Sequence, residues 1–364
     1  MDDRSARPLV PPIQLSTVFE RTPQGDYPEG FSYTRSGNPN RAALESELAR
    51  LECGAEAAAF ASGLAASHAV FQTLKSGDHA LIPREAYWGL RAMLEEIFPR
   101  WGLTATAVDM TSPEAVRAAL RPTTRLVWVE TPSNPTMRVT DLAAVSQLAK
   151  AAGALLVCDN TVATPALQQP LALGVDWIVH STTKYLNGHS DVLGGAVVAR
   201  TADAAFARLR SVQNLGGAVP SPFDCWLTLR SLKTFPLRVA AQSATALAVA
   251  EFLASHPRVT VVHYPGLTRH PDHALARRQM RGFGGLLSFE VTGGAAEAIA
   301  VLNACRVIRR ATSLGGSESS MEQRRSVEGP TSTTPPALLR LSIGLEPAAD
   351  LTADLAQALG QVFG

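Results

Sequence analysis

Short apolar runs recur between residues 56 and 200 and are separated by segments with helix-like spacing of apolar positions. The runs are AAAFAS (57–62), HALIP (79–83), TATAVD (104–109), RLVWVE (125–130), ALLVCD (154–159), WIVHS (177–181) and GAVVAR (195–200). Segments such as EAYWGLRAMLEEIF (85–98) and DLAAVSQLAKAAG (141–153) lie between them. This alternation predicts an α/β fold with a mainly parallel, seven-stranded sheet covered on both faces. A tight connection precedes the last run, so we expect that strand to be antiparallel.

The pattern is different on either side of this region. The first forty residues are irregular and rich in Pro, Gly and Ser, and a helical pattern begins at PNRAALESELARLECG (39–54). Beyond residue 235 a long helical segment (237–257) precedes strand-like runs at 259–266, 285–293 and 338–346. We therefore expect an N-terminal arm (1–40), a large domain (41–235) and a smaller α+β domain (236–364).

The composition fits a folded enzyme. Of 364 residues, 46% are hydrophobic and 18% are charged, which argues against disorder. The formal net charge of +1 gives no electrostatic footprint for nucleic acid, and we expect no membrane partner. The N-terminal residues MDDRSARPLVPP lack the layout of a secretory signal, and the four cysteines form no C-x-x-C pair. We expect a cytoplasmic protein without a disulfide framework.

Polar side chains directly follow three of the predicted strands. They are Asp159 after one strand, Glu130, Ser133 and Asn134 after another, and Ser181, Thr183 and Lys184 after a third. Ligands of open parallel sheets bind at the carboxyl ends of the strands, so these side chains are candidates for a common site. Lysine is usually a solvated charge, yet Lys184 follows a buried run. His180 and His189 have no further ligands at metal spacing, and we expect no metal site.

The junction at Ser62 and Gly63 leaves free N–H groups at the start of a helix, which suits a phosphate. The chain has neither a P-loop motif nor a G-x-G-x-x-G fingerprint. Pyridoxal 5′-phosphate (PLP) requires a lysine for a Schiff base, an acid beside its pyridinium nitrogen and donors for its phosphate. The residues thus favour PLP, while a nicotinamide-dependent oxidoreductase without a standard fingerprint stays open at this point.

Long segments resemble the cystathionine γ-synthase/γ-lyase/β-lyase family of PLP-dependent enzymes. They include YTRSGNPNRAALESELARLECG (33–54), ASGLAASHAVF (61–71), ETPSNPTMRVTDL (130–142), VCDNTVATPALQQPLALGVDWIVHSTTKYLNGHSDVLGG (157–195), SLGGSES (313–319) and LLRLSIGLE (338–346). The resemblance implies an aspartate-aminotransferase-like fold (PLP fold type I). It also implies a homotetramer, built as a dimer of catalytic dimers, whose N-terminal arm contacts the neighbouring subunit.

The resemblance further implies a role for individual residues. Lys184 would bind the cofactor covalently and later transfer protons, Asp159 would pair with the pyridinium nitrogen, and Tyr87 would stack on the ring. The phosphate ligands implied are Ser181, Thr183, the amides of Gly63 and Leu64, and Tyr33 and Arg35 of the neighbouring subunit. Arg340 would hold the substrate α-carboxylate in bidentate fashion, assisted by Asn134 and Ser313.

The sequence departs from the family pattern on the distal side of the substrate. Thr312 stands where many synthases and γ-lyases have the Glu that meets the distal ammonium of cystathionine, and Trp88 replaces a smaller residue. After Ser320, a short segment with SVEGPTSTTPP replaces the usual MTH-containing stretch.

These departures leave the cofactor residues unchanged but leave the reaction open. We expect a carbon–sulfur lyase of transsulfuration that converts cystathionine, or a related thioether amino acid, to an oxo acid, ammonia and a thiol. The alternatives are γ-replacement on an O-acylhomoserine, a catalytically silent relative kept for binding, and the oxidoreductase above.

Overall fold

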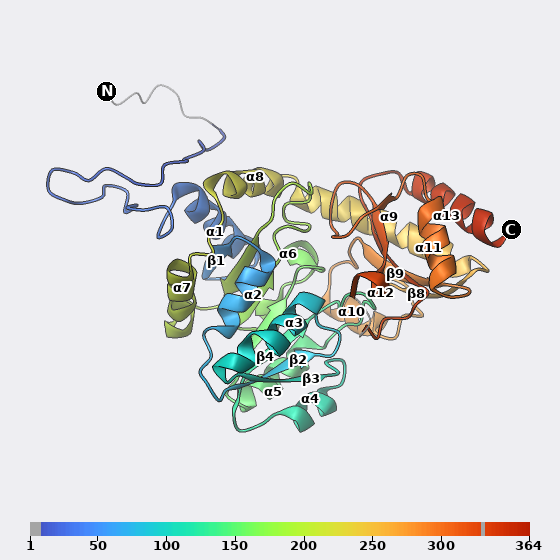
Figure 1. The fold of residues 1–364 in the computed structure, drawn as a ribbon, viewed down its shortest axis with the longest axis horizontal. Coiled ribbons are helices and arrows are strands. Elements are labelled where there is room, and N and C mark those ends of the chain that lie inside the picture. The colour runs from blue at the N-terminus through green and yellow to red at the C-terminus, as the bar shows by residue number, and fades with distance from the viewer. Residues whose placement is uncertain (1–8, 329–331) are drawn as a thin grey trace.

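The computed structural model describes residues 9–328 and 332–364, which fold around two β-sheets (Figure 1). The larger sheet has seven strands in the order β1-β7-β6-β5-β4-β2-β3. These strands are β1 (Glu56–Phe60), β2 (His79–Pro83), β3 (Thr104–Val108), β4 (Thr124–Glu130), β5 (Leu155–Asp159), β6 (Trp177–His180) and β7 (Gly195–Ala199). β7 is antiparallel to both of its neighbours, and the other strand pairs are parallel. The predicted fold class and the antiparallel last strand are confirmed.

Helices cover both faces of this sheet because its strands are apolar on both sides. Val127 and Val129 of β4 pack into one hydrophobic cluster, whereas Leu126 and Trp128 pack into a second cluster on the opposite face. The first cluster includes residues of α1 (Pro39–Leu51), α4 (Pro113–Ala119), α5 (Leu142–Ala151) and α8 (Pro222–Leu232). The second includes residues of α2 (Gly63–Phe71), α3 (Trp88–Glu96) and α7 (Ala204–Gly216). The short helix α6 (Thr164–Leu167) follows β5.

The second sheet lies in the C-terminal part of the chain and has the order β10-β11-β12-β9-β8. Its strands are β8 (Val259–His263), β9 (Leu286–Val291), β10 (Arg309–Arg310), β11 (Ser320–Gln323) and β12 (Leu338–Ser342). A third hydrophobic cluster joins this sheet to α9 (Phe235–Ser255), α11 (Ala295–Ala304) and α13 (Ala348–Phe363), which Figure 1 shows together. The short helices α10 (His273–Gln279) and α12 (Arg324–Glu328) lie in the connections. The strands of the larger sheet all precede residue 235 and those of the second sheet all follow it, and the domain bounds stay a prediction.

The helix α9 is long and apolar enough to cross a membrane by length and composition alone. It packs against β8, β9 and α13. Its buried Arg238 donates hydrogen bonds to the carbonyl groups of Tyr185 and Leu186. These contacts are those of a core helix that joins the two sheets.

The N-terminal arm extends away from the rest of the chain (Figure 1). Val18 and Tyr33 form an isolated antiparallel bridge within it, and Trp226 of α8 donates a 2.8 Å hydrogen bond to the carbonyl of Pro11. Leu9, Leu15 and other apolar side chains of the arm are exposed.

Candidate active site

Lys184 lies in a tight turn directly after β6, at the carboxyl edge of the larger sheet. Arg238 of α9 holds this turn through its hydrogen bonds to the carbonyl groups of Tyr185 and Leu186. Gly188 has a φ of 69°, and a Cβ there would lie 1.8 Å from the Arg238 guanidinium, so glycine suits this position. The Lys184 Nζ donates a 2.8 Å hydrogen bond to Oγ of Ser313. Burial and the positive charge of Arg340 lower the pKa of Lys184 to about 8. Near neutral pH a part of the lysine population is therefore uncharged and able to act as nucleophile or base.

Ser313 joins the lysine to the predicted substrate arginine. Its backbone has a φ of 80°, a conformation that residues other than glycine rarely adopt and that is typical of functional sites. Its carbonyl accepts a 2.8 Å hydrogen bond from Nη2 of Arg340, whose Nη1 donates to Oδ1 of Asn134 at 3.2 Å. The structure thus brings together the three predicted carboxylate-binding residues. Burial lowers the pKa of Arg340 to about 10, which leaves it cationic at neutral pH.

Two carboxyl groups stand side by side at the ends of β4 and β5. Glu130 and Asp159 are paired in the parallel register of these strands. Asp159 Oδ1 accepts a 2.9 Å hydrogen bond from the amide of Thr161, and Glu130 Oε2 accepts one of 2.9 Å from the amide of Tyr87. Burial raises the pKa of Asp159, and burial together with Asp159 raises the pKa of Glu130 to about 8. A cation beside Asp159, such as a pyridinium, would stabilise the negative charge on that residue.

The N-terminus of α2 lies next to the lysine turn and offers amide groups to a ligand. The Ser62 side chain caps the helix by accepting from the amide of Ala65 at 3.0 Å, whereas the amides of Gly63 and Leu64 have no acceptor within the described ranges. A Cβ at Gly63 would lie 2.9 Å from Cβ of Ser181, so the close approach of helix and turn requires glycine. Free amides at a helix N-terminus suit a phosphate. The donor set of lysine, strand-end acid and phosphate-binding amides therefore fits PLP.

The hydroxyl of Thr183, a predicted phosphate ligand, already forms hydrogen bonds within the protein. The Thr183 hydroxyl donates to the carbonyl of Gly194 at 3.1 Å and accepts from its amide at 3.0 Å. A phosphate would compete with Gly194 for that hydroxyl proton, and the role of Thr183 stays a prediction.

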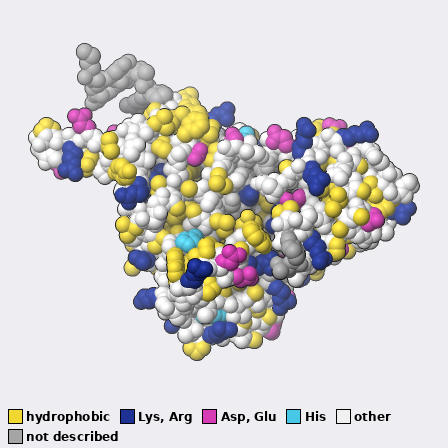
Figure 2. All heavy atoms as spheres, viewed as in Figure 1, with side chains coloured by type: hydrophobic (Ala, Val, Ile, Leu, Met, Phe, Trp, Pro, Cys, Tyr) yellow, Lys and Arg dark blue, Asp and Glu magenta, His cyan; other side chains and the backbone are white. Residues whose placement is uncertain are grey.

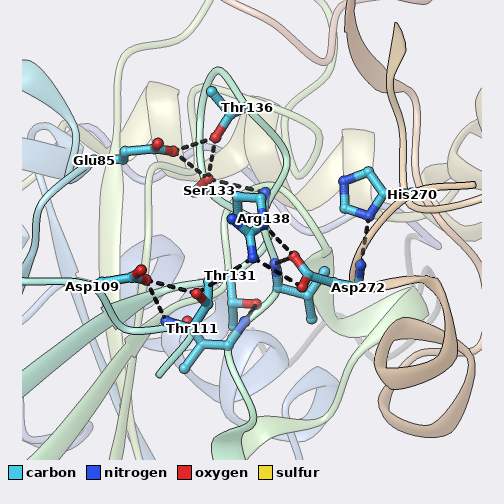
Figure 3. Close-up of polar contacts among 11 residues, drawn as sticks. Glu85, Asp109, Thr111, Thr131, Ser133, Thr136, Arg138, His270 and Asp272 are labelled. Carbon is cyan, nitrogen blue, oxygen red and sulfur yellow. Dashed lines mark hydrogen bonds and ion pairs between the residues drawn. The ribbon is translucent and has the colours of Figure 1, made fainter. Parts of the chain in front are cut away.

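A polar network holds the loop that presents Asn134. Arg138 contacts Asp272, which directly precedes α10, with its Nε 2.6 Å from Oδ2 (Figure 3). Ser133 Oγ donates to Glu85 at 3.0 Å and accepts from the amide of Arg138 at 3.1 Å. Ser133 is a candidate site residue because it follows a strand. Its hydrogen bonds to Glu85 and Arg138 instead stabilise the loop. The network ties the loop after β4 to the segment before α10, in the C-terminal part of the chain.

Two further predicted residues, Tyr33 and Arg35, have no described contact with this cluster. Arg35 donates a 3.0 Å hydrogen bond to the carbonyl of Asn214 and stacks on Tyr33, with no described contact to Lys184. Their role in a neighbouring subunit stays a prediction. The side chain of Tyr87 and that of Thr312 are exposed.

The two histidines of the lysine stretch have structural contacts. His180 Nε2 lies 2.5 Å from Oε1 of the buried Glu52. His189 Nδ1 contacts the carbonyl of Asn187 and the hydroxyl of Ser231.

Sequence reasoning missed two charged residues beside Arg340. Glu322 of β11 and Arg324 of α12 are buried, and Oε1 of Glu322 is 2.7 Å from Nη2 of Arg340. The only signal for them was their position in the segment after Ser320 that departs from the family pattern.

The comparisons with known proteins agree with this site. Residues 1–360 match the sequence model of the Cys/Met metabolism PLP-dependent enzymes. The chain is 48% identical to a cystathionine gamma-synthase of Mycobacterium bovis, over 96% of this chain and 91% of the relative. It is 41% identical to a cystathionine gamma-lyase of Dictyostelium discoideum, over 98% and 94%. The crystal structure of cystathionine gamma synthase from Xanthomonas oryzae pv. oryzae, in complex with aminoacrylate and cysteine, superposes with a TM-score of 0.93 at 42% identity, over 97% of this chain and 93% of that one.

Proposed function

The chain belongs to the Cys/Met metabolism PLP-dependent enzymes, and we propose that it is a cystathionine γ-synthase-type enzyme, which replaces the γ-substituent of an O-acylhomoserine by a thiol. The observation that carries this proposal is the higher identity to a protein named as a synthase, 48%, than to one named as a lyase, 41%. Membership of this family leaves no support for the nicotinamide alternative.

Thr312 is compatible with this proposal. A carboxylate at this position would meet the distal ammonium of cystathionine, whereas the exposed Thr312 carries no charge. An O-acylhomoserine has no distal ammonium, so an uncharged Thr312 is compatible with this substrate. Because many synthases also carry the carboxylate and form cystathionine as their product, Thr312 does not by itself separate replacement from elimination.

The residues of the chain divide the chemical work. When bound, PLP supplies an electron sink that stabilises negative charge at the substrate Cα. Arg340 and Asn134 orient the substrate carboxylate, and Lys184 Nζ, whose pKa is lowered to about 8, removes the Cα proton. The Ser313 hydroxyl fixes the direction of Nζ, 2.8 Å away. Loss of a γ-substituent requires a second proton transfer, at Cβ. In this proposal Lys184 carries out both proton transfers.

Elimination is the second candidate, because it shares every step up to the departure of the substituent. The carbon–sulfur lyase reaction expected from the sequence would release an oxo acid instead of accepting a thiol. The Dictyostelium discoideum relative, 41% identical, is named as a lyase, which supports elimination as the second candidate reaction.

The proposal includes assembly into a homotetramer made of catalytic dimers and a cytoplasmic location. Hydrophobic side chains are exposed on the view shown in Figure 2, and further ones are exposed on or next to α2, α3 and α8. They include Leu64, Trp88, Ile97 and Phe223. Such a surface, together with an arm carrying Tyr33 and Arg35, supports contact with a second copy.

One pair of incubations tests the reaction. The holoenzyme is supplied with O-acetylhomoserine or O-succinylhomoserine together with cysteine, and separately with cystathionine alone. We expect cystathionine from the first mixture and little oxo acid from the second. Rapid release of pyruvate or 2-oxobutyrate from cystathionine, without synthesis in the first mixture, would reverse the order of the two candidates.

A further inference from the structure

Strand β11 and helix α12 place a row of alternating charges beside Arg340. Glu322 stands directly opposite Arg340 in the antiparallel pair of β11 and β12. Its Oε1 lies 2.7 Å from Nη2 of Arg340 and accepts a 2.8 Å hydrogen bond from Nη1 of Arg324. Arg324 Nε in turn donates to Oε1 of Glu328 at 3.0 Å. Two guanidinium groups therefore share one oxygen of Glu322.

Because this row is buried, each of its charges needs an oppositely charged partner. Glu322, Arg324 and Arg340 are only 5%, 4% and 4% exposed. A buried charge that loses its partner is strongly unfavourable. Oε2 of Glu322 has no hydrogen-bond partner among residues 9–328 and 332–364. The negative charge of Glu322 thus depends on contacts at Oε1, from two arginines.

A substrate carboxylate must use the arginine that Glu322 also contacts. If Arg340 were the sole partner of Glu322, the two charges would neutralise each other, and an incoming carboxylate would have to displace the buried Glu322 from Arg340. Arg324 supplies a second positive charge for Glu322, so that Arg340 can also bind the substrate carboxylate. Its charge also reaches Lys184, whose pKa is lowered first by burial and then by Arg340, with a smaller effect of Arg324.

We propose that Arg324 is a positioning residue that sets the affinity for the substrate α-carboxylate, because it takes up the charge of Glu322 and leaves Arg340 available. This inference rests on the amino-acid substrate of the proposed function. It does not depend on whether the reaction is replacement or elimination. It also assigns a role to the segment after Ser320, where the chain departs from the family pattern.

The test compares two ligands of the holoenzyme that differ only in the carboxylate. L-norvaline has no γ-leaving group, and n-butylamine is the same molecule without its carboxylate. Dissociation constants for both are measured from the change in cofactor absorption. Arg324→Met should weaken norvaline binding about tenfold, the size of one charge-assisted contact, and leave butylamine binding unchanged. Arg324→Lys keeps the charge and should restore most of the affinity.

The direction in which a second substitution changes norvaline affinity distinguishes this mechanism from simple structural damage. Adding Glu322→Gln to Arg324→Met removes the competing anion and should return norvaline affinity toward that of the wild type. Arg325→Met, an exposed neighbour on the same helix, is the matched control and should change neither ligand.

Three results would overturn the proposal: equal weakening of both ligands, no weakening of norvaline binding, or a double variant weaker than the single one. If Arg324→Met does not fold, Glu322→Gln alone carries the test. It should lower the dissociation constant of norvaline, and an unchanged or higher value contradicts the proposal. Norvaline binding needs neither a leaving group nor a thiol, so failure of the γ-replacement assay leaves these outcomes readable.

Discussion

The Nζ of Lys184 donates a 2.8 Å hydrogen bond to Oγ of Ser313, a residue 129 positions further along the chain. The carbonyl of the same serine accepts a hydrogen bond from Arg340. Ser313 thus fixes the distance between the residue that moves protons and the residue that holds the substrate carboxylate. It does so in a left-handed backbone conformation that only a well-supported site maintains.

Removal of the Ser313 hydroxyl should slow the reaction more than it weakens binding. In Ser313→Ala, Lys184 loses the acceptor that orients Nζ, whereas the carbonyl contact to Arg340 remains. We expect kcat to fall about tenfold, as for a mispositioned general base, with KM changed much less. Steady-state kinetics check this, with Ser317→Ala as control. A rise in KM at constant kcat would show that Ser313 acts through substrate binding instead.

The pKa of Lys184 should appear as a pH dependence of the stability of the cofactor-free protein. The folded pKa is about 8 and the reference value is 10.5, so the unfolded chain binds more protons between these pH values. Stability contributed by this group therefore rises as the pH increases from about 8 to 10.5. Lys184→Met should be more stable than the wild type at pH 7, and this difference should shrink through that window. Urea unfolding at a series of pH values measures it, and a constant difference would contradict the lowered pKa.

A methyl group at Gly63 should damage the cofactor site selectively. The added Cβ would lie 2.9 Å from Cβ of Ser181, so α2 must shift away from the lysine turn. We expect Gly63→Ala to bind PLP about tenfold more weakly or worse, because the amides at the helix N-terminus move. Gly216→Ala on α7 is the control, since its Cβ would meet nothing within 4 Å. Equal retention of PLP by both variants would argue against the phosphate site at α2.

The core of the fold could be predicted from the sequence because its strands are apolar runs between amphipathic helices. All seven strands of the larger sheet coincide with such apolar runs, as do β8, β9 and β12. β10 and β11 could not be found this way, because Arg309–Arg310 and Ser320–Gln323 are short and largely polar.

The site could be predicted only as far as it follows from local position or from the family resemblance. Asp159 could be found because it ends a buried strand, and Lys184 because it shortly follows another. The Arg340–Asn134 contact joins residues 206 positions apart, and only the resemblance indicated it. Glu322 and Arg324 were missed, because charged residues in a polar segment are usually exposed, whereas here they stabilise each other inside the protein.

Arg35 tests the proposed sharing of the site between subunits. Within one chain it contacts Asn214 and has no described contact with the lysine cluster. If it completes the phosphate site of a neighbour, Arg35→Ala should release PLP about tenfold more readily, the usual loss for one charged hydrogen bond to phosphate. Arg21→Ala, on the same arm, is the control. Cofactor retention after dialysis measures both, and unchanged retention in Arg35→Ala would contradict a shared site.

The most direct test of the account is to locate the cofactor on the chain. Borohydride reduction of the holoenzyme, followed by proteolysis and mass spectrometry, shows which lysine carries the reduced cofactor. The chain offers Lys75, Lys150 and Lys233 as internal controls. We predict the added mass of a phosphopyridoxyl group on the peptide that contains Lys184, together with loss of the aldimine absorption in Lys184→Ala. Labelling of another lysine, or of none, would contradict the assignment of this site.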